Sequence, residues 1–232
     1  MSDYYSSILN NESIENTVVS FYYGDAPYRV AIKYSEEERV LATKKLIKIL
    51  QSMTVDEIVD ILEENIQMCA DITANNIPIF SNINFVDDVL RIVKANPDCT
   101  CELIGYYFNK DAKVGAQNKY GGNHRKIAEN TGLISSQRPR ILTDLGEEFI
   151  KLDDNETDKL KPRLYLMIPI ILKTIVAAKH GVVDVEEIMG MYLSEKSIER
   201  RRGNTRSMVE RVCNEMAHGD KLKYNMIWKK NG

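Results

Sequence analysis

The segment GAQNKYGGNHRKIAENTGLI, residues 115–134, decides the interpretation of this chain, because it combines a helical pattern with an unusual polar surface. Tyr120, Ile127 and Ala128 are spaced so that they fall on one side of an α-helix. The spacing therefore predicts a helix over residues 115–130, whose outer face carries Asn118, Lys119, Asn123, Arg125 and Lys126.

An outer face of this composition suits the major groove of DNA. Asparagine pairs with adenine edges, whereas arginine and lysine pair with guanine or with phosphates. The alternative is a solvated helix that packs only within the protein. His124 has two roles open to it, either a base or phosphate contact or a half-buried packing or capping position.

The flanking sequence predicts a winged helix-turn-helix. Val86–Val93 form a helix that stops at Asn96, and Thr100 caps a second helix that runs to Phe108. After Gly132, two short strands surround the basic turn at Arg138 and Arg140. An arginine-bearing wing tip would reach a minor groove or the adjacent backbone, and a turn with solvated arginines is the alternative.

A second copy of the same order follows an acidic linker, residues 153–159. We expect a long apolar helix over 162–178, a short helix over 185–191, a helix capped by Ser194, and a terminal strand over 221–229. The third helix has a stripe of Ile198, Thr205, Val209 and Val212, with Lys196, Arg200, Arg201, Arg206 and Arg211 mostly off it. These cations either contact phosphates or form ion pairs with neighbouring glutamates.

The N-terminal third has a different pattern. Residues 16–34 alternate β-branched and aromatic side chains around a Gly-Asp-Ala-Pro turn, which predicts a strand, a turn and a second strand. Ser35 then caps a helix, and Thr54 with Glu57 forms a capping box for another that ends at residues 75–78. The apolar seam of that helix, with its acids, predicts a dimerisation or partner surface, a cap on the first winged helix, or a DNA mimic.

The charges are segregated along the chain, although the net charge is only −3. Residues 53–88 contain eight acids and no lysine or arginine, whereas residues 109–140 contain seven bases and two acids. Because only charges within about 10 Å of a phosphate attract it strongly, this local asymmetry favours nucleic-acid binding more than the net charge opposes it.

Several other classes lack their sequence signals. No apolar run approaches the roughly 18–20 residues of a membrane span, and the start does not have the pattern of a signal peptide. The four cysteines, at 69, 99, 101 and 213, do not have zinc-site spacing. No nuclease or nucleotide-binding motif is present, so we expect a cytoplasmic protein without catalysis, metal or cofactor.

Two segments resemble known modules. Asn130–Ile134 with Arg140–Gly146 resembles the G-L…x-L-T-x-x-G ending of winged helix domains. SEKSIERRRGNTRSMVERV (194–212) resembles a helix of small bacterial winged helix modules that accompany restriction-modification and defence proteins, with Ser194, Ile198, Arg201, Arg202, Thr205 and Val209 carrying the match. The resemblance covers about 85–151 and 163–230, and the second copy departs from it by having Met208 before Val209 and no LTxxG close.

The sequence thus predicts a mainly α protein with small β hairpins (α+β): an N-terminal region over 1–84, a first winged helix over 85–152 and a second over 160–232. The expected activity is sequence-specific binding of double-stranded DNA, as a transcriptional regulator or the specificity component of a defence system. The alternatives are a type II restriction endonuclease with an unrecognised metal site and a winged-helix protein–protein scaffold. The expected partners are double-stranded DNA and a second copy of the chain in a homodimer. The predicted contacts are Asn118, Lys119, Asn123, His124, Arg125, Lys126, Arg138, Arg140, Lys196, Arg200, Arg201 and Arg206.

Overall fold

The computed structural model describes residues 4–24 and 33–229. Helices make up 67% of the protein, and the sheet consists of two strands of two residues each within those ranges. The prediction of a mainly α protein is therefore confirmed. The predicted β hairpins are almost entirely missing from the part of the chain that the structure describes, and each absence has a local cause.

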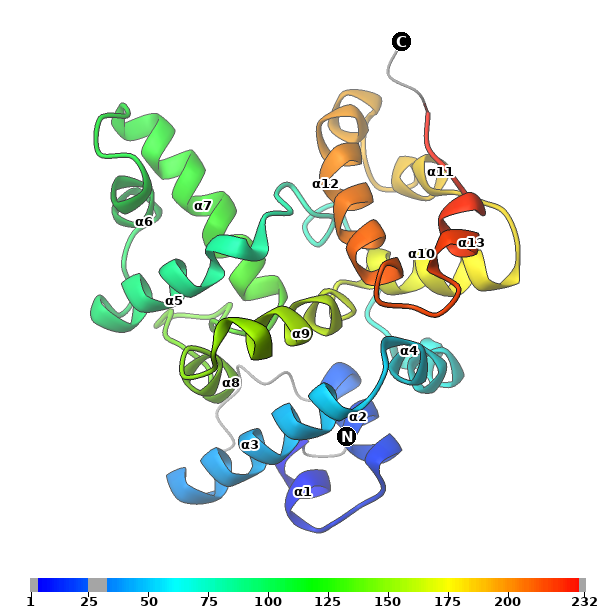
Figure 1. Ribbon diagram of the computed structural model, residues 1–232. Helices are drawn as coiled ribbons and strands as arrows, with labels where there is room; N and C mark the ends of the chain where they lie inside the picture. Colours follow the sequence, from blue (N-terminus) through cyan, green and yellow to red (C-terminus); the bar gives the residue numbers. More distant parts are fainter. Residues whose placement is uncertain (1–3, 25–32, 230–232) are drawn as a thin grey trace.

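Four helices form one end of the molecule: α1 (Tyr4–Leu9), α2 (Ile14–Tyr23), α3 (Glu36–Ser52) and α4 (Val55–Glu64) (Figure 1). The strand predicted from residue 16 is wrong, because α2 is a helix capped by the Ser13 hydroxyl, which accepts from Asn16 N–H at 3.2 Å. Val18 and Phe21, three residues apart, are fully buried, so tertiary packing outweighs the β-branched preference. Most of the predicted turn and second strand lies outside the described residues.

Both capping boxes in this region are confirmed. Ser35 and Glu38 exchange hydrogen bonds at the start of α3, as do Thr54 and Glu57 at the start of α4. The predicted end of α4 is wrong: the helix stops at Glu64 and a 3₁₀ turn, η1 (Ile66–Met68), follows.

The apolar seam of α4 faces the interior of this same chain. Ile58 and Leu62 are fully buried, and α4 packs against α2, α9 (Asp154–Tyr165) and α10 (Pro169–His180). Ile58 and Leu62 of the seam are therefore used within this chain, where they face the second unit rather than the first, whereas Ile61 and Ile66 remain half-buried.

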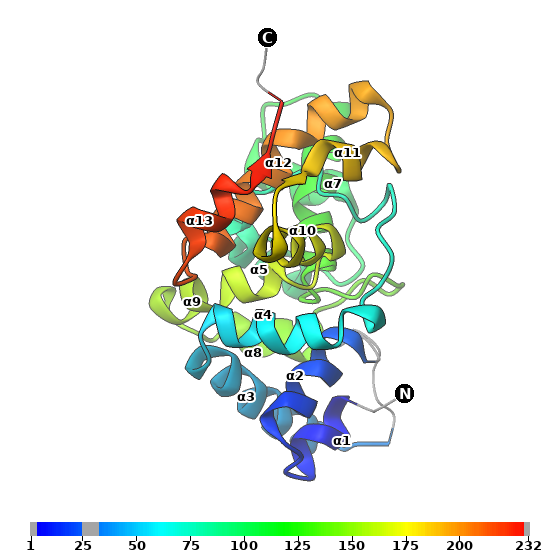
Figure 2. The ribbon, with the colours of Figure 1, turned by 90° about the vertical axis from the view of Figure 1, so that its right-hand side faces the viewer.

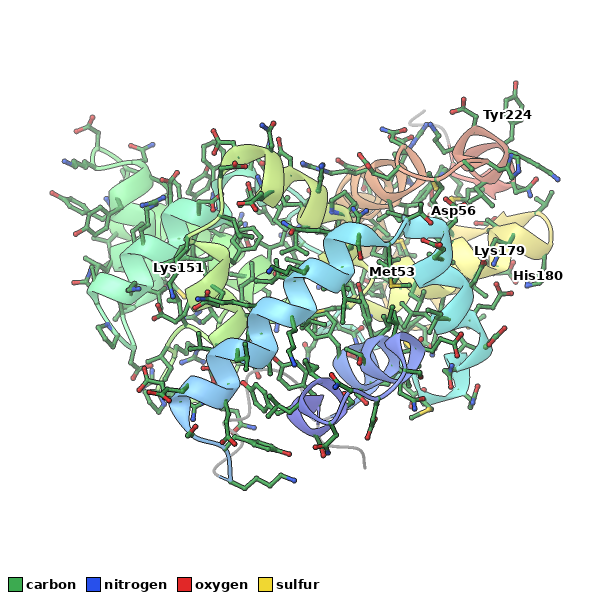
Figure 3. The ribbon with its side chains drawn as sticks, turned by 60° about the horizontal axis from the view of Figure 1, so that its bottom comes forward. Met53, Asp56, Lys151, Lys179, His180 and Tyr224 are labelled. Carbon is green, nitrogen blue, oxygen red and sulfur yellow. The ribbon has the colours of Figure 1, made fainter. Side chains whose placement is uncertain are left out.

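The acids of α4 also bind within the chain. Lys179 Nζ lies 2.6 Å from Asp60 Oδ1, and both Lys179 and His180 pair with Glu63. Figure 3 shows Lys179 and His180 at the end of α10, beside α4. At the other end of α4, the Ala217 amide donates to Asp56 Oδ2 at 3.0 Å. Much of the acidic segment therefore has a structural use as a link between distant parts of the chain.

The middle of the chain follows the predicted order of helices. η2 (Ile83–Phe85), α5 (Val86–Ala95), α6 (Cys101–Phe108) and α7 (Val114–Asn130) precede α8 (Asp144–Phe149), which begins after its Thr143 cap. The predicted wing strands are wrong in extent, because the antiparallel pairing in this region is a single bridge between Ile134 and Leu142. The turn is fastened instead to the α5–α6 connection, where the Asp98 amide donates to the Arg140 carbonyl at 2.9 Å.

Two glycines allow α6 and α7 to touch along their backbones. A Cβ on Gly121 would lie 1.9 Å from the Cys101 carbonyl oxygen, and one on Gly105 would lie 1.9 Å from the Gln117 carbonyl oxygen. Neither atom could move without shifting a helix. Gly121, expected to weaken α7, is therefore required for the crossing of the two helices.

The last part of the chain departs from the predicted second copy in three places. The acidic linker is the first half of α9, which Asp153 and Glu156 cap, and a separate helix, α10, begins at Pro169. The predicted terminal strand is mostly α13 (Gly219–Tyr224), followed by β2 (Met226–Ile227). β2 pairs in parallel with β1 (Val183–Asp184), so no antiparallel wing forms here among the described residues.

The predicted helices on either side of Ser194, a short one before it and a long one after it, are confirmed. α11 (Val185–Gly190) is capped by Asp184, and α12 (Glu195–Cys213) buries Thr205, Val209 and Val212 as predicted. The buried apolar side chains of all three predicted domains form one continuous cluster, so the predicted boundaries do not separate independent cores. Figure 2 shows the helices stacked along the molecule, with α1, α2 and α3 at one end and α11 at the other. None of the helices in the described ranges has the length and apolar content to cross a bilayer.

Candidate nucleic-acid interface

Helices α7 and α12 lie on opposite sides of a groove of about 270 Å³. Its lining combines Lys119 and Asn123 of α7 with Ser197, Arg200 and Arg201 of α12, and Ile79 lies between them. The segment that joins α4 to α5 passes between the two helices (Figure 1). Four predicted contact residues, about eighty positions apart in sequence, thus meet at one place.

Hydrogen bonds fasten that joining segment to α12. Arg201 Nη1 donates to the carbonyl oxygens of Ala74 and Ile77 at 2.5 and 3.0 Å. Asn204 Nδ2 donates to the Ile79 carbonyl at 2.7 Å, and its Oδ1 lies 3.0 Å from the Ser81 hydroxyl. We call residues 74–81 the bridging segment. Arg201 is therefore partly structural, because its Nη1 already donates to two carbonyl oxygens of the bridging segment.

The bridging segment also enters α7. The Phe80 ring lies 4.4 Å from the His124 ring and 6.3 Å from the Tyr120 ring, measured between centroids. Phe85 and Phe108 complete the aromatic cluster around His124. The bridging segment therefore sets the relative position of α7 and α12, because its residues contact both helices.

His124 is at the centre of that cluster and is fully buried. Neither ring nitrogen has a hydrogen-bond partner, and burial lowers the pKa of His124 to about 4, partly offset by Asp88. His124 is therefore a neutral packing residue at neutral pH. Its expected contact with DNA is wrong, and the packing alternative is the one that the structure contains.

The end of α7 is less available than its composition suggested. Glu129 is almost fully buried, and its carboxylate pairs with three cations. Its oxygens lie 3.1 Å from Arg125 Nε, 3.2 Å from Arg140 Nε and 3.8 Å from Lys126 Nζ. Arg138 lies 3.7 Å from Asp98 but keeps a largely exposed side chain. Arg125, Lys126 and Arg140, three of the predicted DNA contacts, are thus paired with one carboxylate. This agrees with the alternative in which the polar face of α7 packs only within the protein.

Other cations are uncommitted. Lys119, Lys196 and Arg200 are exposed and make no ion pair with a residue in the described ranges, whereas Arg206 pairs with Glu210 at 2.7 Å. Arg202, which carried part of the resemblance, pairs with Glu186 at 2.6 Å. Burial and the neighbouring charge of Arg200 lower the pKa of Arg201, so an anion in the groove would relieve a repulsion between two guanidinium groups. Asn118 is exposed on α7.

Sequence reasoning missed the bridging segment altogether. Ile79, Phe80 and Asn204 carry no charge pattern or motif, and their role depends on contacts between distant elements. Across residues 4–24 and 33–229, no group of three or more His, Cys, Asp or Glu side chains is arranged to hold a metal ion. The four cysteines are free, and burial raises the pKa of Cys69, Cys99 and Cys213.

Comparison with known proteins gives no relative: no protein-family model, no curated protein and no solved structure matches this chain.

Proposed function

We propose that the protein binds double-stranded DNA without cutting it, and that the groove between α7 and α12 receives the phosphate backbone. The observation that carries this proposal is the convergence of Lys119, Arg200 and Arg201 on one groove whose lining includes no acid. Cations without acidic partners release counterions when they meet phosphates, which is the main source of affinity for DNA.

The proposed roles divide into two groups. Asn118 and Asn123 on α7 would read base edges, because an asparagine amide offers adenine both a donor and an acceptor. Lys119, Lys196 and Arg200 would hold phosphates on either side, with Arg138 at the exposed turn as a further contact. Arg125, Lys126 and Arg140 would contribute mainly structure, since Glu129 already holds them.

The order of α5, α6, α7 and the turn before α8 supports an interpretation of residues 85–152 as a reduced winged helix-turn-helix, with α7 as its reading helix. The wing would be the loop between the bridged residues Ile134 and Leu142. On the resemblance of the two segments to bacterial modules, we propose a transcriptional regulator or the specificity component of a defence system.

The test is the salt dependence of DNA binding, measured by fluorescence anisotropy with a duplex of mixed sequence. Three to four phosphate contacts predict that log K falls against log salt with a slope of roughly −3. Replacing Lys119 and Arg200 with alanine should weaken binding and reduce that slope by about 2.

The matched control removes two other cations. Lys45 and Lys48 on α3 form no ion pair with a described residue and lie at the opposite end of the molecule (Figure 1). Their double alanine variant should bind as the parent protein does. If both double variants bind equally well, the groove is not the site.

The scaffold alternative is favoured by one observation, the engagement of Arg125, Lys126 and Arg140 with Glu129. It predicts no retention of duplex DNA even at low salt, so the same titration separates the two functions. Incubating plasmid DNA with the protein and Mg²⁺ distinguishes the endonuclease alternative, which predicts cleavage.

A further inference from the structure

A second hollow lies at the start of α7, apart from the groove between α7 and α12. It has a volume of about 290 Å³ and is enclosed by the end of α6, the loop over residues 109–113 and the first two turns of α7. Figure 1 shows this loop joining α6 and α7 at the outer end of the molecule. The volume is just below the range of about 300–1,000 Å³ that drug-sized ligands occupy, so a single flat ring system fits better than a larger molecule.

The walls of the hollow suit a flat aromatic ligand. Phe108 and Tyr120 line it, with ring centroids 6.0 Å apart and an interplanar angle of 76°. Phe108 is itself stacked on His124, with centroids 4.4 Å apart. Both rings are therefore held in place before a ligand arrives, which reduces the entropy lost on binding.

Polar groups at the same place can recognise the edge of a ring. Gln117 is almost fully buried, and its Nε2 donates to the carbonyl oxygens of Asn109 and Lys110 at 3.0 and 3.2 Å. These bonds fix the loop and leave the side-chain oxygen of Gln117, Oε1, without a hydrogen-bond donor among the described residues. The exposed Asn109 side chain, which also lines the hollow, has no hydrogen bond to the described part of the chain.

The surroundings of the hollow are basic. Lys110 and Lys113 belong to the loop that closes it, are exposed and form no ion pair within residues 4–24 and 33–229, with Asp111 as the one acid between them. Cations next to an aromatic hollow suit a ring that is attached to phosphates on either side. A neutral aromatic metabolite would make no use of them.

We propose that this hollow binds one unpaired nucleobase of DNA, with Tyr120 stacked on its face and Phe108, at 76° to Tyr120, against its rim. Gln117 and Asn109 would bind the polar edge of the base, and Lys110 and Lys113 the adjacent phosphates. This proposal rests on the proposed function, because the groove would bring the DNA to the protein. It adds a preference for DNA in which one base is not stacked within the duplex. Such a base costs least to present when it is already unpaired, at a bulge, a mismatch or a strand end.

The experiment compares two duplexes that differ by a single unpaired 2-aminopurine in the centre of one strand. Affinity is measured by anisotropy, and stacking by the fluorescence of the 2-aminopurine. We expect the bulged duplex to bind about tenfold more tightly than the paired one, within the range for one base stacked on an aromatic side chain, and the 2-aminopurine emission to fall.

Two variants locate the preference. Ala116→Leu fills the hollow from an exposed position and removes no packing, and Tyr120→Leu keeps bulk while removing the ring. Both should reduce the affinity ratio to about one, and Ala116→Leu should leave binding of the paired duplex within about twofold of the parent. Tyr106→Ala is the control, since Tyr106 is 44% exposed against 41% for Tyr120 and does not line the hollow.

Equal affinity of the parent protein for the two duplexes would overturn the proposal, and so would an affinity ratio that survives Ala116→Leu. The proposed function fails separately: if the paired duplex does not bind while the bulged one binds and depends on Tyr120, the hollow stands and the groove does not.

Discussion

Replacing Gly121 with alanine should destabilise the protein, although alanine is the better helix former. The added Cβ would lie 1.9 Å from the Cys101 carbonyl oxygen and 2.5 Å from the Gly105 amide nitrogen, both backbone atoms of α6. To reach an ordinary contact, α6 and α7 must separate by roughly 1.5 Å, which disrupts the packing of the buried side chains at their interface. Overpacking of this kind costs about 1–3 kcal/mol, against a gain of about 1 kcal/mol in helix propensity.

The same substitution elsewhere provides the control. A Cβ on Gly115, in the same helix, or on Gly203 in α12 meets nothing within 4 Å. Gly203→Ala should therefore stabilise the protein by about 0.5–1 kcal/mol, and Gly115→Ala by less because it lies in the first turn.

Urea unfolding measures the free energy of unfolding of the three variants and the parent under one set of conditions. Gly121→Ala should be less stable than Gly203→Ala by about 1–3 kcal/mol, because both variants gain helix propensity and only the first is overpacked. Equal stability of the three variants would refute the close crossing of α6 and α7. Circular dichroism would confirm that the helices of the Gly121 variant still form.

Three further outcomes follow from the described contacts. Burial lowers the pKa of His124 to about 4 in the folded protein, whereas the unfolded chain protonates it near 6.5. The free energy of unfolding should therefore be full above about pH 6.5 and fall by about 3 kcal/mol as the pH approaches 4. In urea unfolding, His124→Phe should flatten that part of the pH profile, and an unchanged profile would show that other groups cause it. Asn204→Ala removes two hydrogen bonds to the bridging segment, at Ile79 and Ser81. Duplex affinity should therefore fall several-fold, while the slope of log K against log salt stays unchanged. A slope reduced by about 1 would instead show that a phosphate is bound directly beside Asn204. Glu129→Gln should destabilise the protein by about 2 kcal/mol, because it breaks a buried set of ion pairs. It should also steepen the salt dependence of DNA binding, because Arg125 and Lys126 are released. Glu147→Gln is the control and should do neither, because Glu147 forms an exposed ion pair with Lys94.

Predictions from the sequence succeeded where the controlling interactions are local. Ser35 with Glu38 and Thr54 with Glu57 are three residues apart, so a capping box needs only the chain itself. Thr100 likewise predicted the start of α6, where its hydroxyl accepts from the Leu103 amide, whereas Ser194 predicted the start of α12 without making a side-chain cap bond. Predictions failed where distant packing decides the outcome, as in α2, whose β-branched residues are buried in a helix, and at residues 219–227, where alternating side chains form α13 and β2.

The candidate site divides in the same way. The spacing of Tyr120, Ile127 and Ala128 located α7 correctly, but charge counting could not show which of its cations are free. Glu129 lies four residues from Arg125 and three from Lys126, so the pairing could have been anticipated from helix geometry. The contribution of Arg140 could not, because it depends on how the turn folds back onto α7.

The bridging segment explains why the two proposed reading helices must be considered together. α7 and α12 make their common groove only because residues 74–81 contact both, with Phe80 among the aromatic rings of α7 and backbone carbonyls held by Arg201 and Asn204 of α12. A groove of about 270 Å³ has room for a phosphate but not for a duplex, so a duplex would have to contact its rim rather than enter it. Affinity for DNA should therefore depend on the spacing of Lys119 and Arg200 across the rim, and changes to the bridging segment should alter binding without removing any charge.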